Sequence, residues 1–109
     1  MKEDAPLGVF EEQVLLAVLR TDVDAFGMSV RREIEDVTGR EVAIGAVYAT
    51  LDRLEAKRLV RSYRAPAADG RERRMFAATR AGLLALAESR AMRERLWRGV
   101  NVPKLIEEY

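Results

Sequence analysis

Apolar residues recur with helical spacing along residues 7–20, where Phe10, Val14 and Val18 mark one stripe of a predicted helix. Further apolar positions widen this stripe, and they include Leu15, Leu16, Ala17 and Leu19. A helix that is apolar around most of its circumference is buried on more than one side. We therefore expect it to pack on the core of its own domain with one face and on a partner chain with another.

A second helix is predicted for residues 29–38, after a polar loop at residues 21–27. Ser29 is a suitable N-cap, because its hydroxyl oxygen can accept a hydrogen bond from a backbone amide of the first turn. The apolar positions of this helix have the spacing of a buried stripe and are Val30, Ile34 and Val37. Gly39 is the expected end of the helix, and residues 41–43 are predicted to form a short strand.

The third predicted helix, at residues 44–57, has apolar residues at i, i+4 and i+7, namely Val47, Leu51 and Leu54. Its remaining surface carries side chains that a purely structural helix does not need, and these are Tyr48, Thr50 and Arg53. The helix leads directly into a strand-like segment at residues 59–64. A helix with one face on a small core and a polar opposite face, followed by a hairpin, is the arrangement of a DNA-reading winged helix.

A hairpin follows the third helix. Residues 59–64 and 73–79 are the two predicted strands, and Pro66 with the Asp69-Gly70 pair occupies the turn between them. Because this connection is longer than a tight two-residue turn, we expect it to protrude as a loop.

The last helix is predicted to begin at Thr79, which is a favourable N-cap, and to end at Asn101 and Pro103. The order helix, helix, helix, hairpin, helix predicts a mainly α fold with a small β-hairpin. We expect residues 1–79 to form a winged helix-turn-helix DNA-binding domain. We expect residues 80–109 to form a C-terminal dimerisation helix and tail within the same compact unit.

The composition excludes several classes of protein. The chain has 109 residues and contains neither Cys nor His, which rules out disulfides, thiolate nucleophiles, imidazole bases and Cys/His metal sites. No Gly-rich phosphate loop or other enzyme motif is present, so we expect neither an enzyme nor a cofactor. There is no run of about 18 apolar residues that would predict a membrane span. Residues 1–8 lack the apolar core of a signal peptide, and the expected compartment is the cytoplasm.

Charge is distributed unevenly along the chain, although the net charge is only +1. Residues 1–28 carry two basic and six acidic side chains, whereas residues 58–76 carry six basic and two acidic ones. A basic hairpin on a nearly neutral protein fits contact with phosphate groups at one place. The alternative is a solvated charged hairpin without a ligand.

The third helix and the hairpin supply a candidate set of DNA contacts. In a helix-turn-helix the second helix reads base edges, mostly with its N-terminal residues, while phosphate contacts fix its position. The small residues Gly45 and Ala46 allow close approach, and Tyr48 and Thr50 offer hydroxyl groups. The predicted DNA-contacting residues are Ser29, Gly45, Ala46, Tyr48, Thr50, Arg53, Arg71, Arg73 and Arg74.

Two side chains of the third helix also have a purely structural interpretation. Tyr48 can be a half-buried core aromatic instead of a phosphate donor. Arg53 can form a surface ion pair with Asp52 or Glu55 instead of reaching a phosphate or a guanine.

The three hairpin arginines are not equivalent. Strand alternation places Arg74 on the same side of the hairpin as Phe76, which we expect in the core, and Arg71 and Arg73 on the other side. Arg74 is therefore predicted to lie over the core. Arg71 and Arg73 are the stronger candidates for phosphate or minor-groove contact.

Trp97, the only tryptophan, lies late on the last amphipathic helix. Tryptophan is enriched as an anchor at protein interfaces, so a dimer contact is its first interpretation. One wall of a flat apolar pocket for a small planar aromatic ligand is the second. The predicted dimerisation residues are Phe10, Val14, Leu83, Leu86, Met92, Leu96 and Trp97.

Four motifs make the chain similar to the PadR family of bacterial transcriptional regulators over about residues 7–98, namely LGVFEEQVLLAVLR, AFGMSVRREIE, VAIGAVYATLDRLEAKRLV and GRERRMFAATRAG. The short C-terminus resembles members with a single dimerisation helix. The resemblance implies a homodimeric winged helix that usually represses transcription, with its C-terminal helix packed against the partner's N-terminal region. Some members bind phenolic or drug-like effectors at the dimer interface. The family usually has Gly where this chain has Arg58, so this residue must either adopt a left-handed helix end at some cost or end the helix differently.

We therefore expect a dimer whose two recognition helices enter successive major grooves of a pseudo-palindromic site, roughly 34 Å apart. The alternative is a winged-helix protein-interaction module that does not bind DNA. The six acidic and five basic side chains of residues 29–57 favour that alternative slightly. The salt dependence of any DNA affinity separates the two hypotheses. The expected partners are double-stranded DNA, a second copy of the chain and a small planar aromatic ligand, with no membrane.

Overall fold

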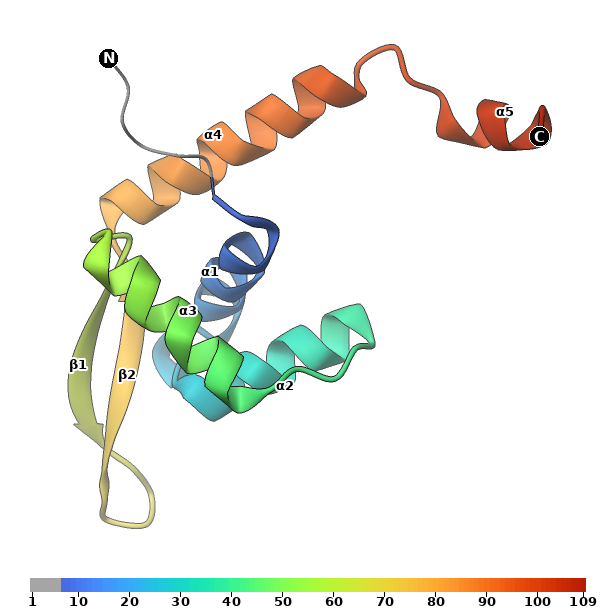
Figure 1. Ribbon diagram of the computed structural model, residues 1–109. Helices are drawn as coiled ribbons and strands as arrows, with labels where there is room; N and C mark the ends of the chain where they lie inside the picture. The colour runs from blue at the N-terminus through green and yellow to red at the C-terminus, as the bar shows by residue number, and fades with distance from the viewer. Residues whose placement is uncertain (1–6) are drawn as a thin grey trace.

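The structure is a computed structural model that describes residues 7–109, so the expectations for residues 1–6 lie outside the described residues. The elements follow the predicted order as far as the fourth helix (Figure 1). They are α1 (Val9–Thr21), the short 3-10 turn η1 (Asp22–Asp24), α2 (Gly27–Thr38), α3 (Ile44–Ala56), β1 (Val60–Pro66), β2 (Glu72–Ala78), α4 (Arg80–Trp97) and α5 (Val102–Glu107). The predicted fold class, mainly α with a two-stranded hairpin, is confirmed.

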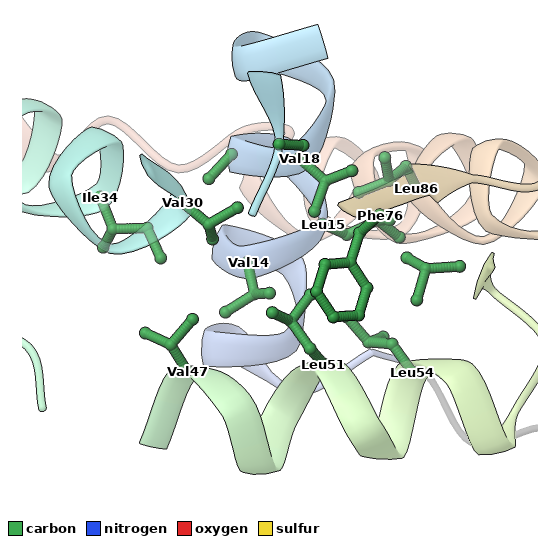
Figure 2. Packing of buried hydrophobic residues seen from close by; sticks show 13 residues of the cluster. Val14, Leu15, Val18, Val30, Ile34, Val47, Leu51, Leu54, Phe76 and Leu86 are labelled. Atoms are coloured by element: carbon green, nitrogen blue, oxygen red, sulfur yellow. The ribbon is translucent and has the colours of Figure 1, made fainter. Parts of the chain in front are cut away.

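The hydrophobic core lies where α1 crosses α3, with α2 on one side and β2 with α4 on the other (Figure 2). Val14 and Leu15 of α1 are fully buried against Leu51 and Leu54 of α3, and Phe76 of β2 closes the cluster. Burying a side chain of this kind contributes about 1.5–3 kcal/mol. The cluster therefore fixes the rotation of α3 and decides which of its faces points outward.

β1 and β2 form a regular antiparallel hairpin without a β-bulge. Its register runs from Val60 opposite Ala78 to Pro66 opposite Glu72. The turn beyond Pro66 extends away from the helices as a loop (Figure 1). The hairpin is thus the wing of the predicted winged helix.

A third short segment joins the sheet, but not where the sequence suggested. Phe26 forms a single antiparallel bridge with Met75 of β2. The strand predicted for residues 41–43 is wrong, since these residues are irregular. The amide of Val42 donates instead to the carboxylate of Glu35 at 2.8 Å, which ties the connection between α2 and α3 to α2. The residue bridged to the hairpin therefore comes before α2, not after it.

α4 begins at the base of the wing and projects away from the core (Figure 1). Thr79 is the N-cap as predicted, and its hydroxyl oxygen accepts a hydrogen bond from the amide of Gly82 at 3.1 Å. A Cβ atom at Gly82 would lie 2.2 Å from the carbonyl oxygen of Leu59. Glycine at this position therefore lets α4 lie directly against the start of the wing.

The predicted end of the last helix at Asn101 and Pro103 is wrong. α4 ends at Trp97, and Asn101 begins α5, accepting a hydrogen bond from the amide of Lys104 at 3.1 Å. Proline in the first turn of a helix loses no hydrogen bond, so Pro103 fits a helix start better than a stop. Within residues 7–109, no helix combines the length and apolar character that crossing a membrane requires.

Candidate nucleic-acid interface

The core holds α3 with one face outward. Val47 and Leu51 are fully buried, whereas Gly45 and Ala46 in the first turn are exposed. A Cβ atom added to Gly45 would meet nothing within 4 Å. The start of α3 is therefore an open surface on which small residues leave the backbone accessible to a ligand.

Tyr48 lies at the edge of this open surface and is partly buried, and its contact with a phosphate stays a prediction. Its side chain is 39% exposed. A Cβ atom at Gly27 would lie 2.3 Å from its Cζ and 2.4 Å from its hydroxyl oxygen, so the ring rests directly on the first residue of α2. Tyr48 thus joins α3 to the start of α2 while part of the ring remains accessible.

Thr50 does not lie on the open surface, and the prediction that it contacts DNA directly is wrong. Its side chain is only 1% exposed, because residue 50 follows Val47 by three positions and shares its face of the helix. Its hydroxyl oxygen accepts a hydrogen bond from Nη2 of Arg53 at 3.0 Å. Arg53 is exposed, and within the described chain it is anchored by Thr50 and not by a neighbouring carboxylate.

Ser29 is neither the N-cap of α2 nor an exposed contact, so both predictions for it are wrong. Phe26 is the N-cap, and Ser29 is a buried residue of the first turn. Its hydroxyl accepts a hydrogen bond from the amide of Phe26 at 2.9 Å and lies 2.5 Å from the carbonyl oxygen of Asp24, to which it donates. Ser29 therefore fastens the loop before α2 and stays away from the surface.

The wing carries two arginines that are free to meet an anion. Arg71 and Arg73 are exposed, and neither forms an ion pair within residues 7–109. The loop that precedes them turns at Gly70, whose φ is +83°, and the amide of Arg71 donates to the carboxylate of Asp69 at 3.0 Å. Their positive charge is therefore available at the outer part of the wing.

Arg74 lies over the core, as predicted from strand alternation. Its guanidinium is 4.8 Å from the ring centroid of Phe76, and it forms ion pairs with Asp52 at 3.1 Å and Glu55 at 2.5 Å. The hydroxyl of Ser62, at 2.5 Å, and the guanidinium of Arg74 lower the pKa of the Glu55 carboxyl. Arg74 thus offsets part of the negative charge of α3 that would otherwise repel a phosphate backbone, and its guanidinium is already occupied by these two carboxylates.

The turn from α3 into the wing has the left-handed residue that the sequence suggested at Arg58. Its φ is +63°. The amide of Arg58 donates to the carbonyl oxygen of Glu55 at 2.9 Å, and the amide of Leu59 donates to that of Leu54 at 2.8 Å. This pair of bonds is the Schellman pattern of a helix end. A backbone conformation that favours glycine therefore sets the angle between α3 and the wing.

The predicted dimerisation residues divide into two groups. Val14 and Leu86 are buried in the core of the monomer, although the sequence predicted that they would face a partner. Phe10 is partly buried against the same core. The remaining residues lie along α4, where Met92 is half-buried and the others are exposed, namely Leu83, Leu96 and Trp97.

A family model described as the transcriptional regulator PadR-like family matches residues 15–88, which include α2, α3, the wing and the start of α4. The chain belongs to the PadR-like family. Its members are transcriptional regulators and not enzymes, and the resemblance drawn from the four motifs is confirmed. No match was found among curated proteins.

Solved structures share the PadR-like fold. A PadR family transcriptional regulator from Eggerthella lenta is 26% identical with a TM-score of 0.67, over 93% of this chain and 90% of that one. A Streptococcus transcriptional regulator is 22% identical with a TM-score of 0.72, over 88% and 92%. A PadR-like transcriptional regulator from Bacillus cereus is 21% identical with a TM-score of 0.66, over 93% and 90%.

Two residues of this PadR-like surface were missed in the sequence. The ring of Phe26 lies under the guanidinium of Arg73 at 4.2 Å and near that of Arg32 at 5.9 Å. Phe26 comes from the loop before α2, Arg32 from α2 and Arg73 from β2. No local pattern in the sequence signals this grouping, because only the tertiary fold brings the three elements together.

Proposed function

We propose that this PadR-like protein is a sequence-specific DNA-binding transcriptional regulator that acts as a homodimer on a pseudo-palindromic operator. The observation that carries the proposal is the open first turn of α3 beside a wing with two arginines, Arg71 and Arg73, that form no ion pair within residues 7–109. Small residues such as Gly45 permit entry into a major groove, and the arginines supply attraction to phosphates. In this scheme α3 contributes selectivity through Tyr48 and Arg53, and the wing contributes affinity.

The exposed apolar side chains of α4 support the homodimer. Leu83, Leu84, Leu96 and Trp97 are all exposed on a helix that projects from the core. Several large apolar side chains exposed on one helix indicate an interaction site in a globular protein. A second copy that covers α4 would bury this surface and place two recognition helices on one duplex.

We further propose that the bound dimer represses transcription and that a small planar aromatic ligand relieves the repression. The side chain of Trp97 is 60% exposed in the single chain, at the end of α4, so in the proposed dimer it would form one wall of a flat apolar pocket at the interface. Titration of the tryptophan fluorescence with planar aromatic compounds tests this part. Quenching together with release of DNA supports it, and an unchanged signal across a broad panel argues for packing alone.

A mobility-shift assay with the DNA upstream of the protein's own gene tests the main proposal. We expect selective binding that weakens steeply as salt increases. Arg53→Ala and Arg71→Gln should weaken binding while sedimentation still shows the dimer. Lys104→Gln is the charge-matched control on α5, far from the wing, and should bind normally (Figure 1). Binding without salt dependence, or none at all, would favour a protein-interaction module instead.

A further inference from the structure

Two arginines from different elements converge on one aromatic ring beside the recognition helix. Arg73 of β2 lies 4.2 Å from the ring centroid of Phe26, and Arg32 of α2 lies 5.9 Å from it. Neither guanidinium forms an ion pair in the part of the chain that the structure describes. Both positive charges therefore lie within 5.9 Å of the same ring centroid, and neither is paired with a carboxylate of the described chain.

The ring that carries these charges is held in place. The backbone of Phe26 bridges to Met75, and its amide donates to the hydroxyl of the buried Ser29 at 2.9 Å. Attraction between a guanidinium and an aromatic face offsets part of the repulsion between the two arginines. Both guanidinium groups therefore have an aromatic partner before any ligand arrives.

The site adjoins the open surface of α3. Phe26 directly precedes Gly27, and the ring of Tyr48 rests on Gly27. A DNA strand that borders the groove entered by α3 would therefore pass close to the two guanidinium groups. The planar donor fork of arginine fits the oxygens of a phosphate group in a bidentate manner.

We propose that Arg32 and Arg73 bind one backbone phosphate of the duplex and that Phe26 is the positioning residue that orients both. This inference rests on the proposed DNA binding and adds Arg32 and Phe26 to its contacts. Such a site would hold this phosphate at a fixed position relative to the first turn of α3. It would therefore also fix the register of α3 along the duplex.

The salt dependence of duplex affinity tests the site. The probe is a labelled duplex of mixed sequence and about three helical turns, titrated at several KCl concentrations. Loss of one phosphate contact in each protomer removes two contacts from the proposed dimer, which reduces the magnitude of the slope of log K against log salt by about 1.8. We expect this reduction for Arg32→Gln, and a loss of affinity of about three- to fivefold for Phe26→Leu, which keeps an apolar side chain but no aromatic face.

The matched control is Lys104→Gln, which removes one positive charge far from the site and should leave the slope unchanged. A slope for Arg32→Gln equal to that of the control, with normal wild-type binding, would overturn the site alone. A wild-type protein without salt-dependent duplex binding would overturn the proposed function as well. Saturation of the site by inorganic phosphate, with an unchanged duplex affinity, would show that it takes a free anion and would also overturn the proposal.

Discussion

Arg58 is one of two non-glycine residues with a positive φ in the described chain. A left-handed conformation costs an L-residue roughly 1–2 kcal/mol because its Cβ atom meets the following carbonyl oxygen. The two bonds of the Schellman turn hold it there nonetheless. The chain thus accepts a local strain at the joint between α3 and the wing.

Arg58→Gly should raise the free energy of unfolding by about 1 kcal/mol, because glycine adopts this conformation without the steric cost. Denaturant titration at neutral pH measures the change. Ala56→Gly, in the last turn of α3, is the matched control and should lower the same free energy by about 1 kcal/mol. A less stable Arg58→Gly protein would mean that the arginine side chain itself supports the turn.

Glu11 is a buried acidic residue that links α1 to the end of α3. Its carboxylate accepts hydrogen bonds from the amide of Gly8 at 2.9 Å and from Nζ of Lys57 at 2.7 Å. Burial raises the pKa of Glu11, but the bonds from Lys57 and Gly8 outweigh this effect and hold its pKa below the ordinary value of 4.5. The folded protein therefore binds this proton less tightly than the unfolded chain does.

The stabilisation from Glu11 should be complete above pH 4.5 and should disappear as the pH falls through the lower pKa of the folded state. Glu11→Gln is expected to flatten the loss of stability over this acidic range. Unfolding free energies measured between about pH 3 and pH 7 give the slope. Glu107→Gln, on the exposed α5, should keep the slope of the wild-type protein.

At the scale of elements, the helices could be predicted because their apolar periodicity is strong and local. The rotation of α3 was only partly predicted. Thr50 is three positions from Val47, a spacing that places it on the buried face, but its hydroxyl suggested exposure. The bridge between Phe26 and Met75 is a single tertiary contact, and no alternation of apolar and polar residues around Phe26 predicts it. The contact between Arg32 and Phe26 could not be predicted either, because it also depends on the tertiary fold.

Two glycines should respond to alanine in opposite ways. Gly82→Ala should lower the free energy of unfolding by about 1–3 kcal/mol, because the new Cβ atom meets the backbone of Leu59. Gly45→Ala should raise it by up to about 1 kcal/mol, since the position is open and helical. Thermal unfolding measures the change in stability of both variants, and duplex titration measures the change in DNA affinity.

Gly45→Ala should also weaken duplex binding, because its methyl group would stand on the turn proposed to enter the groove. If the more stable variant bound DNA as tightly as the wild type, the first turn of α3 would not approach the bases closely.

At the scale of the whole molecule, the chain is far from spherical. Its extents are 58 × 38 × 21 Å, and α4 and α5 account for its elongated form (Figure 1). α4 is tied back to α1 by an ion pair between Arg93 and Glu12. Beyond that point Leu96 and Trp97 are exposed. An extended helix with an apolar end is a suitable element for joining two copies.

Leu96→Asp should shift the protein from dimer to monomer, because the carboxylate would have to lose its hydration in the proposed interface. Sedimentation velocity measures the mass, and circular dichroism checks that the helices remain. Duplex affinity should fall as well, since one protomer contacts only one half-site. The control is Val23→Asp, which changes an equally apolar, exposed residue on η1 and should leave the mass unchanged.

The Schellman turn at the end of α3 has a mechanical consequence. The hydroxyl of Thr79 donates to the carbonyl oxygen of Arg58 at 2.7 Å, and the amide of Thr79 donates to that of Leu59 at 3.0 Å. α4 and the wing therefore start from one shared pivot. Because α4 has 18 residues and is about 27 Å long, tilting its far end by about ten degrees corresponds to a displacement of about 5 Å over that length. In the proposed dimer, a small change in the angle of α4 at this pivot would therefore change the separation of the two wings.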